Sequence, residues 1–521
     1  MNPFPSLLLL AQQGQQAPAG PVLRHPPLAF SDIGPVIALT AGALILLTLR
    51  ALVAGKAPRG FYALFTVCSA GVALASATLL WLGFDEKRPR FAFANMIAVD
   101  GFTVFFYVVI SVTVVLAAML AESYLRREHL DGPEFYVLTL LAAAGGMLMA
   151  AANDLVVVFL GLEVLSISLF VLAGFHRRRL ESGEAAMKYF ILSAFSSAFL
   201  LYGIALVYGS TGTTNLAGIA AWLATNVVLK NAVLLAGLAL LVVGFGFKVA
   251  AVPFHTWTPD VYQGSPTPVT AFMAGASKAA GFAAFLRVFF SAFDALRVDW
   301  KPLVWALAVA SLLVGSVLAV VQTDVKRMLA YSSISHAGYV LVGMQAASAR
   351  GLSGSLFYVL AYTFMVMGSF AIVMVVAGRG DSATSLEAFR GLSSRRPALA
   401  LAMTVLLMAQ AGVPFTSGFF AKFYVISAAV EQRSYALALI AMLAAVVAAF
   451  FYLRVVLVMY SPPVGAETAG EESEGEGEAP ERLPIPLSAG LALASTVAFT
   501  LIAGVVPGSF VEFARSATML F

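Results

Sequence analysis

Apolar runs of roughly 20 residues follow one another along almost the whole chain, separated by short polar breaks. A run of this length is what an α-helix needs to cross the hydrocarbon core of a bilayer. Inside that core every backbone polar group has to be bonded internally, so only helices and closed barrels can span it. The pattern predicts an all-α integral membrane protein whose first partner is the lipid bilayer.

Composition excludes a soluble protein. Of the 521 residues, 60% are hydrophobic and 11% are charged, whereas about a quarter of a soluble domain is charged. The net charge of +4 comes from basic residues in short loops, so nucleic acid is not an expected partner. The single cysteine, Cys68, excludes an intrachain disulfide and a cysteine-ligated zinc or iron–sulfur site, and we expect no metal in this chain.

We expect about 14 membrane-spanning helices, counted as apolar runs between polar breaks. The fourth and fifth are separated by only Asn153 and Asp154. The approximate spans are 33 to 53, 60 to 83, 100 to 124, 134 to 151, 152 to 175, 185 to 209, 229 to 258, 266 to 294, 302 to 322, 326 to 346, 353 to 378, 397 to 430, 434 to 460 and 485 to 507.

Lysine and arginine gather in the odd-numbered loops, for example in the arginine run 177–179. The even-numbered loops hold far fewer, with the segment 87–90 as the main exception. By the positive-inside rule the basic loops lie in the cytoplasm. We therefore expect a protein of the bacterial cytoplasmic (inner) membrane with both termini on the outer, periplasmic side.

The two polar segments of the chain are expected to lie outside the bundle. Residues 1–30 begin with a short apolar run and continue as Gln-, Pro- and Gly-rich sequence, which predicts a flexible N-terminal extension. The segment 461–483 is acidic and of low complexity, which predicts a disordered loop. Transmembrane helices are expected on either side, over 31–151 at the beginning and over 484–521 at the end.

Two lysines and a proline stand inside apolar sequence between Gly244 and Arg287. Lys248 has no charged neighbour within ten residues, and Lys278 is surrounded by small and aromatic residues. Charges placed in this way usually face a bundle interior or a water-filled path and are functional. Pro253 removes a backbone donor, so we expect the helix that carries Lys248 to kink or break there.

The tripeptide Val-Pro-Phe at 252–254 recurs at 413–415. A lone lysine lies near each copy, Lys248 before the first and Lys422 after the second. Many transporters are built from inverted repeats with broken helices at matching positions. The predicted repeats and helix breaks are 134–294 with Pro253 and 302–460 with Pro414.

Glu163 is a further charge at membrane depth. It lies about ten residues beyond Asp154, which at about 1.5 Å per residue puts it near the bilayer midplane. A structural, hydrogen-bonding carboxylate is the alternative. For the lysines the alternative is snorkelling to an interface, which suits Lys188 near a span end but not the deeper lysines.

For other polar residues in the apolar runs, a structural role is also possible. His255 and His336 are read equally well as packed core histidines or as functional groups. Arg287 and Arg454 are expected near a surface or in interhelical pairs.

Four segments resemble a known family: KVAAVPFHTWTPDVYQGSPTPVTAFMAGASKAAGF, NDLVVVFLGLEVLSISLF, TDVKRMLAYSSISHAGY and GVPFTSGFFAKFYV. They are similar to the antiporter-like subunits of respiratory complex I, the proton-translocating NADH:quinone oxidoreductase. These subunits are related to the large subunits of Mrp-type Na⁺/H⁺ antiporters. The resemblance covers about residues 30 to 515. It favours the subunit N type, because WTPDVYQG occurs together with a lysine in the second broken helix.

The resemblance implies that protons pass along a chain of buried charges. Glu163 matches the glutamate of the fifth helix, and Lys248 matches the lysine of the first broken helix that pairs with it. Lys278 matches a central lysine that stores the proton, and Lys422 matches the lysine at the handover end. Residues that match connecting or modulating positions are Lys188, His255, Tyr331 and His336.

The resemblance also implies partners and cofactors outside this chain. FMN, iron–sulfur clusters and quinone are expected in other subunits, with none bound here. The expected partners are the other membrane-arm subunits, including a sister antiporter-like subunit and the small subunits that lead to the quinone site. Alternatives are a stand-alone cation/proton antiporter, a subunit of a multisubunit Na⁺/H⁺ antiporter, a symporter for an organic substrate, and a purely structural subunit.

Overall fold

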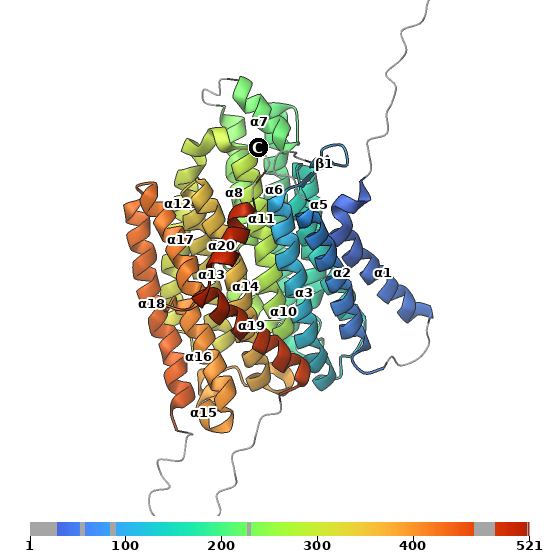
Figure 1. The fold of residues 1–521 in the computed structure, drawn as a ribbon, viewed down its shortest axis with the longest axis vertical. Coiled ribbons are helices and arrows are strands. Elements are labelled where there is room, and N and C mark those ends of the chain that lie inside the picture. Colours follow the sequence, from blue (N-terminus) through green and yellow to red (C-terminus); the bar gives the residue numbers. More distant parts are fainter. Residues whose placement is uncertain are drawn as a thin grey trace, which may run out of the picture.

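In the computed structural model the described residues are 29–52, 58–83, 90–226, 231–462, 485–517 and 519. They form a bundle of long helices (Figure 1). One flank holds α1 (Gly34–Leu52) and α2 (Phe61–Leu82), and the opposite flank holds α18 (Tyr435–Tyr460). Nearly all of the predicted N-terminal extension, 1–30, and of the predicted acidic loop, 461–483, lies outside the described residues.

The first half of the bundle continues with four long helices, and polar caps fix where two of them begin. The Asp100 side chain accepts a hydrogen bond from Thr103 N, and the Asp154 side chain accepts one from Val156 N. A carboxylate at this position satisfies backbone donors that have no partner in the first turn. The helices are α3 (Gly101–Arg127), α4 (Glu134–Ala151), α5 (Leu155–Ala173) and α6 (Leu180–Thr211), followed by the short α7 (Leu216–Thr225).

The first predicted helix break is confirmed. The helix α8 (Ala232–Lys248) ends at the lysine, and α9 (Trp257–Gly264) begins only after a non-helical segment that contains Pro253. The next span is continuous but irregular. It consists of α10 (Thr267–Phe272), a π-helical turn (Met273–Ser277) and α11 (Lys278–Ser291). A π-turn widens the helix locally and is frequent at functional sites.

The second half repeats the pattern of long helices followed by a break. Here α16 (Pro397–Ala411) and α17 (Ser417–Glu431) are separated by a segment that contains Pro414, so the second predicted break is also confirmed. The long helices before the break are α12 (Arg297–Val320), α13 (Val325–Gln345) and α14 (Ala349–Ala377), followed by the short α15 (Leu392–Arg395).

The C-terminal helices lie across the bundle rather than at its edge. The helix α19 (Leu487–Val505) packs against α3, α14 and α17, and it joins helices from the two ends of the sequence (Figure 1). After it, α20 (Gly508–Ser516) packs on α14 and α3. The span Thr267–Ser291 and the helix α14 are the most deeply buried, so the centre of the bundle is the region around Lys278.

Among the described residues, 11 helices are long and apolar enough to cross a membrane. The expected spans that fall outside this set are 229 to 258, 326 to 346 and 397 to 430. The first and last of these are the two broken helices, whose pieces are each shorter than a span. The middle one is α13, whose lysine, arginine, serine and histidine residues lower its hydropathy.

The expectation of an all-α chain is correct for the bundle and incomplete outside it. The strands β1 (Arg90–Ala92) and β2 (Ile97–Val99) form an antiparallel hairpin before α3. Asn95 O in its turn accepts hydrogen bonds from the side-chain amides of Asn153 and Asn215. The hairpin therefore ties together three connections at one end of the bundle. Three-residue strands give too short a pattern to be recognised in an apolar sequence.

Candidate functional site

Lys248 lies at the first helix break, as the last residue of α8. Its side chain is buried. The ammonium Nζ donates to Ser166 Oγ on α5 at 3.0 Å and to Tyr189 OH on α6 at 3.4 Å. A cation at the C-terminal end of a helix is stabilised by the helix dipole. The break therefore exposes a lysine to hydroxyl groups from two neighbouring helices.

Glu163 lies on α5 one turn before Ser166, so the two side chains share a face of the helix. It is half-buried, and its Oε1 atom is buried without a hydrogen-bond partner. The described residues show no direct ion pair between Glu163 and Lys248. In this conformation Lys248 reaches α5 through the hydroxyl of Ser166, a residue that the sequence analysis did not select.

Lys278 is the first residue after the π-helical turn and is buried at the centre of the bundle. Its Nζ donates to Ser333 O on α13 at 2.6 Å and to the Oγ atom of the same serine. The ammonium lies 5.7 Å from the ring centroid of Tyr362, within the range of a cation–π contact. All of these partners are neutral.

His336 lies one turn beyond Ser333 on α13 and is also buried. Its Nδ1 atom is 2.7 Å from Tyr358 OH, and its Nε2 atom is 3.1 Å from Tyr452 OH. The ring centroid is 4.7 Å from that of Tyr362, which also faces Lys278. Both ring nitrogens of the histidine are hydrogen-bonded. This geometry fits a packed core histidine and a group that connects two lysines equally well.

Lys422 lies at the second break, on α17. Its Nζ donates to Ala411 O, the last carbonyl of α16, at 2.7 Å, and lies 4.8 Å from the ring centroid of Tyr339. Gly412 has a φ of 94° at this point, and a Cβ atom added there would be 3.0 Å from Lys422 Cδ. The glycine therefore permits both the left-handed backbone and the approach of the lysine.

The remaining predicted site residues lie in two different settings. Lys188 faces a polar cavity and is described below. His255 lies in the first break, partly buried, and its Nδ1 atom is without a hydrogen-bond partner. Tyr331 packs against the core on α13. Of the four secondary candidates, only His336 lies between two of the main lysines.

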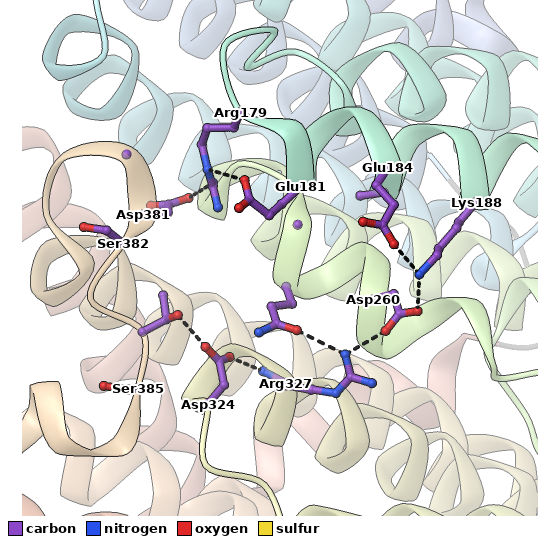
Figure 2. Close-up of a pocket in the computed structure, with 15 residues that line it drawn as sticks. Arg179, Glu181, Glu184, Lys188, Asp260, Asp324, Arg327, Asp381, Ser382 and Ser385 are labelled. Carbon is purple, nitrogen blue, oxygen red and sulfur yellow. Dashed lines mark hydrogen bonds and ion pairs between the residues drawn. The ribbon is translucent and has the colours of Figure 1, made fainter.

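A polar cavity of about 710 Å³ opens between α6, α9, α13 and the segment that follows α14 (Figure 2). Asp260 on α9 accepts from Lys188 at 2.8 Å and from Arg327 at 2.6 Å. Lys188 also contacts Glu184 at 2.6 Å. The charges of this cavity come from segments that are far apart in the chain, so the sequence alone does not indicate it.

Asp381 is a buried carboxylate that lines this cavity. Its Oδ2 atom accepts from Thr267 N, at the beginning of α10, at 3.0 Å and lies 3.5 Å from Lys326 Nζ. Arg179 Nη1, at the start of α6, is also 3.5 Å away. The contacts join both halves of the chain, and they could not be read from the sequence since Asp381 stands in an ordinary polar loop.

The two arginines in apolar runs make interhelical contacts, as one of the two expected readings had it. Arg287 on α11 is fully buried and forms a bidentate pair with Asp100, at 2.9 and 2.7 Å. Of its two expected settings, the interhelical pair is therefore the one that the structure shows, and the ion pair with the α3 cap compensates for its burial. Arg454 on α18 donates to Val320 O at the end of α12 at 2.9 Å. The described residues contain no cluster of metal-binding side chains.

Comparisons with known proteins agree on one family. Residues 152–448 match the family described as NADH:quinone oxidoreductase/Mrp antiporter, transmembrane. The NADH-quinone oxidoreductase subunit N of Trichlorobacter lovleyi is 46% identical over 429 residues, which cover 82% of this chain and 86% of the relative. The subunit N 1 of Solibacter usitatus is 42% identical, with coverage of 82% and 85%.

Solved structures with the same fold include a chain of respiratory complex I from Thermus thermophilus with bound aureothin. It is 33% identical, with a TM-score of 0.75, and the match covers 92% of this chain and 99% of that one. A chain of the Mrp complex from Dietzia sp. DQ12-45-1b is 23% identical, with a TM-score of 0.80 and coverage of 93% and 96%. At that identity the second match carries information on the fold alone.

Proposed function

We propose a proton path for this chain, which belongs to the NADH:quinone oxidoreductase/Mrp antiporter family and is an antiporter-like, proton-translocating membrane subunit of complex I. Its relatives carry the name subunit N. The reading as a stand-alone antiporter is therefore the weaker one. As a subunit without a redox centre of its own, it would move protons while quinone is reduced elsewhere in the complex.

In the proposed path Glu163 and Lys248 load the proton, Lys278 stores it and Lys422 passes it on. Burying an ammonium among neutral groups is costly, and a nearby carboxylate lowers that cost. A movement of Glu163 towards or away from Lys248 would therefore change how readily Lys248 holds its proton. The Oε1 atom of Glu163 supports such a movement. It is buried without a hydrogen-bond partner, so it can still accept a hydrogen bond.

The observation that carries the proposal is the polar link between Lys278 and Lys422. Lys278 contacts Ser333, and His336 follows one turn later on the same helix. Tyr339, which packs on Lys422, stacks on Tyr358, a hydrogen-bond partner of His336. Hydroxyl and imidazole groups in this order can relay a proton when water completes the gaps.

A matched pair of contacts supports the proposed inverted repeats. Asp154 accepts from Thr214, 60 residues later, at the start of α5. Asp324 accepts from Thr384, also 60 residues later, at the start of α13. In each case the backbone forms the same antiparallel bridge. The predicted orientation puts the loop before α5 and the loop before α13 at opposite faces of the membrane. This is what two repeats of opposite topology require.

The proposed topology counts 14 spans by adding three helices to the 11 of unbroken apolar length. They are α13 and the two broken helices, α8–α9 and α16–α17. Both termini would then lie outside the cytoplasmic membrane. The proposed partners are the sister antiporter-like subunit and the small membrane-arm subunits, with FMN, iron–sulfur clusters and quinone in the rest of the complex.

The test uses the purified complex in proteoliposomes, with NADH:quinone electron transfer and proton uptake measured together. Lys248→Ala and Glu163→Ala should lower the number of protons moved per electron. Lys301→Ala, in the first turns of α12, is a matched control that removes a lysine outside the proposed path. Pumping at the wild-type ratio in both path variants would refute the proposal.

A further inference from the structure

We propose that Asp260 is a positioning residue, an electrostatic latch that holds the helix α9 between the two halves of the protein and thereby sets the surroundings of Lys248. The inference rests on the proposed proton path. It concerns a residue whose ion pairs are made with none of the three lysines and the glutamate of that path.

Asp260 is the central member of a three-residue ion bridge (Figure 2). One carboxylate oxygen, Oδ2, is 2.8 Å from Lys188 Nζ on α6, and the other, Oδ1, is 2.6 Å from Arg327 Nη1 on α13. Since α6 belongs to the first half and α13 to the second, a single carboxylate connects both. The helix α9 also packs against α6 and α13, and the carboxylate adds a polar contact to each of them.

The position of α9 reaches Lys248 through Trp257. This residue lies one turn before Asp260, and its indole Nε1 donates to Phe247 O, in the last turn of α8, at 3.1 Å. Its ring stacks on Tyr189, with centroids 4.7 Å apart and an angle of 17° between the rings. Tyr189 OH is a hydrogen-bond partner of Lys248. A shift of α9 would therefore move the indole, the phenol and the ammonium together.

The other arm of the bridge leads to the central lysine. Arg327 is in the first turn of α13, and its backbone N is held by the cap Asp324. The same helix carries Ser333, the partner of Lys278. The ion bridge of Asp260 thus joins α9, which lies next to Lys248, to α13, which contacts Lys278.

The bridge is suited to opening and closing. The side chains of Lys188, Asp260 and Arg327 are 42%, 33% and 31% exposed in the cavity, so water screens both ion pairs and keeps them weak. Lys188 also has a second partner, Glu184, on its own helix at 2.6 Å. When Asp260 moves away, the lysine retains a partner and the cost of release is small.

The other charged groups of the cavity are held by separate partners. Arg179 lies 3.5 Å from Asp381, which is itself held by Thr267 N. Asp324 is the cap of α13 and accepts from Thr384. Asp381 also links the two halves, through Arg179 at the start of α6 and Lys326 on α13. Asp260 differs from it because Asp260 lies on α9 itself and pairs with Lys188 and Arg327.

The test is Asp260→Asn in the complete complex, with proton uptake and NADH:quinone electron transfer measured in proteoliposomes. Loss of two partly exposed ion pairs should slow proton translocation about three- to tenfold, with electron transfer retained. Asp260→Glu should restore pumping to within about twofold, since it keeps the charge. Glu181→Gln is the control, because Glu181 lines the same cavity and is 68% exposed.

A double-mutant cycle separates a latch from a general structural role. Lys188→Gln should slow pumping in the wild-type background and add nothing to Asp260→Asn, because both remove the same pair. Lys188→Gln also serves as the test if Asp260→Asn fails to assemble. Additive effects, or normal pumping in Asp260→Asn while Lys248→Ala is inactive, would overturn the latch alone. Normal pumping in Lys248→Ala would overturn the proton path itself.

Discussion

Gly412→Ala tests whether the hydrogen bond of Lys422 to the end of α16 is needed for proton handover. The glycine has a φ of 94°, and an alanine Cβ would be 3.0 Å from Lys422 Cδ and 3.6 Å from Nζ. A side chain in the left-handed region costs about 1–2 kcal/mol. Displacing the ammonium from Ala411 O, at 2.7 Å, would cost about 1.5–3 kcal/mol more.

The cost of displacing the ammonium from Ala411 O is the one that bears on proton handover. A free-energy difference of 1.4 kcal/mol corresponds to about a tenfold change in a population. We expect the fraction of Lys422 held at Ala411 to fall at least tenfold in Gly412→Ala, and proton translocation to slow about as much. The assay is proton uptake by proteoliposomes at a fixed rate of electron transfer. Thermal stability of the purified complex is measured in parallel.

Gly212→Ala is the matched control. Gly212 ends α6 with a φ of 74°, and a Cβ atom added there would meet nothing within 4 Å. This variant carries the backbone strain of the left-handed region without the displacement of a lysine. Both variants should lose about 1–2 kcal/mol to backbone strain, Gly412→Ala should lose more because its lysine is displaced as well, and only Gly412→Ala should pump slowly. Equal pumping in the two would refute the argument that Lys422 has to reach the α16 carbonyl.

Three further outcomes follow from the same contacts. Arg287→Met removes the bidentate ion pair of the buried Asp100, which should destabilise the protein by about 3–5 kcal/mol, measured as lost assembly or thermal stability; adding Asp100→Asn should recover part of it, because asparagine still caps α3. Ser333→Ala removes a side-chain partner of Lys278 but leaves the backbone carbonyl, so pumping should slow by no more than about tenfold. His336→Phe removes both hydrogen bonds to tyrosine and should slow pumping more than His336→Gln, which retains one; equal rates in all three proteins would rule out a connecting role.

The positions of the charges could be predicted because a membrane makes them conspicuous. A lysine such as Lys248 or Lys278 stands out in apolar sequence, and burying it requires a bundle interior or water. The two breaks were predictable for a similar reason, since Pro253 and Pro414 each remove a backbone donor within a span. Both predictions depend on local physics alone, which one sequence contains.

The partners of those charges could not be predicted in the same way. Lys248 contacts Ser166 and Tyr189 rather than Glu163 directly, and serine or tyrosine in a membrane helix is too common to be selected. Asp260 stands within the segment WTPDVYQG, and nothing in that segment indicates that it joins two helices that are distant in the sequence. Contacts of this kind depend on how the helices pack, and that information is spread over the whole chain.

An asymmetry between the two halves would set the direction of transfer in the proposed path. Counted from the two matched caps, Asp154 and Asp324, Glu163 and Ser333 both stand at the ninth position of their helices. The first position holds a carboxylate that can carry a charge, and the second holds a hydroxyl that cannot. A proton on Lys248 can therefore be balanced locally, whereas one on Lys278 has only neutral partners. In the proposed path a charge in the second setting would be held less firmly, and this would favour its transfer onward through His336 to Lys422.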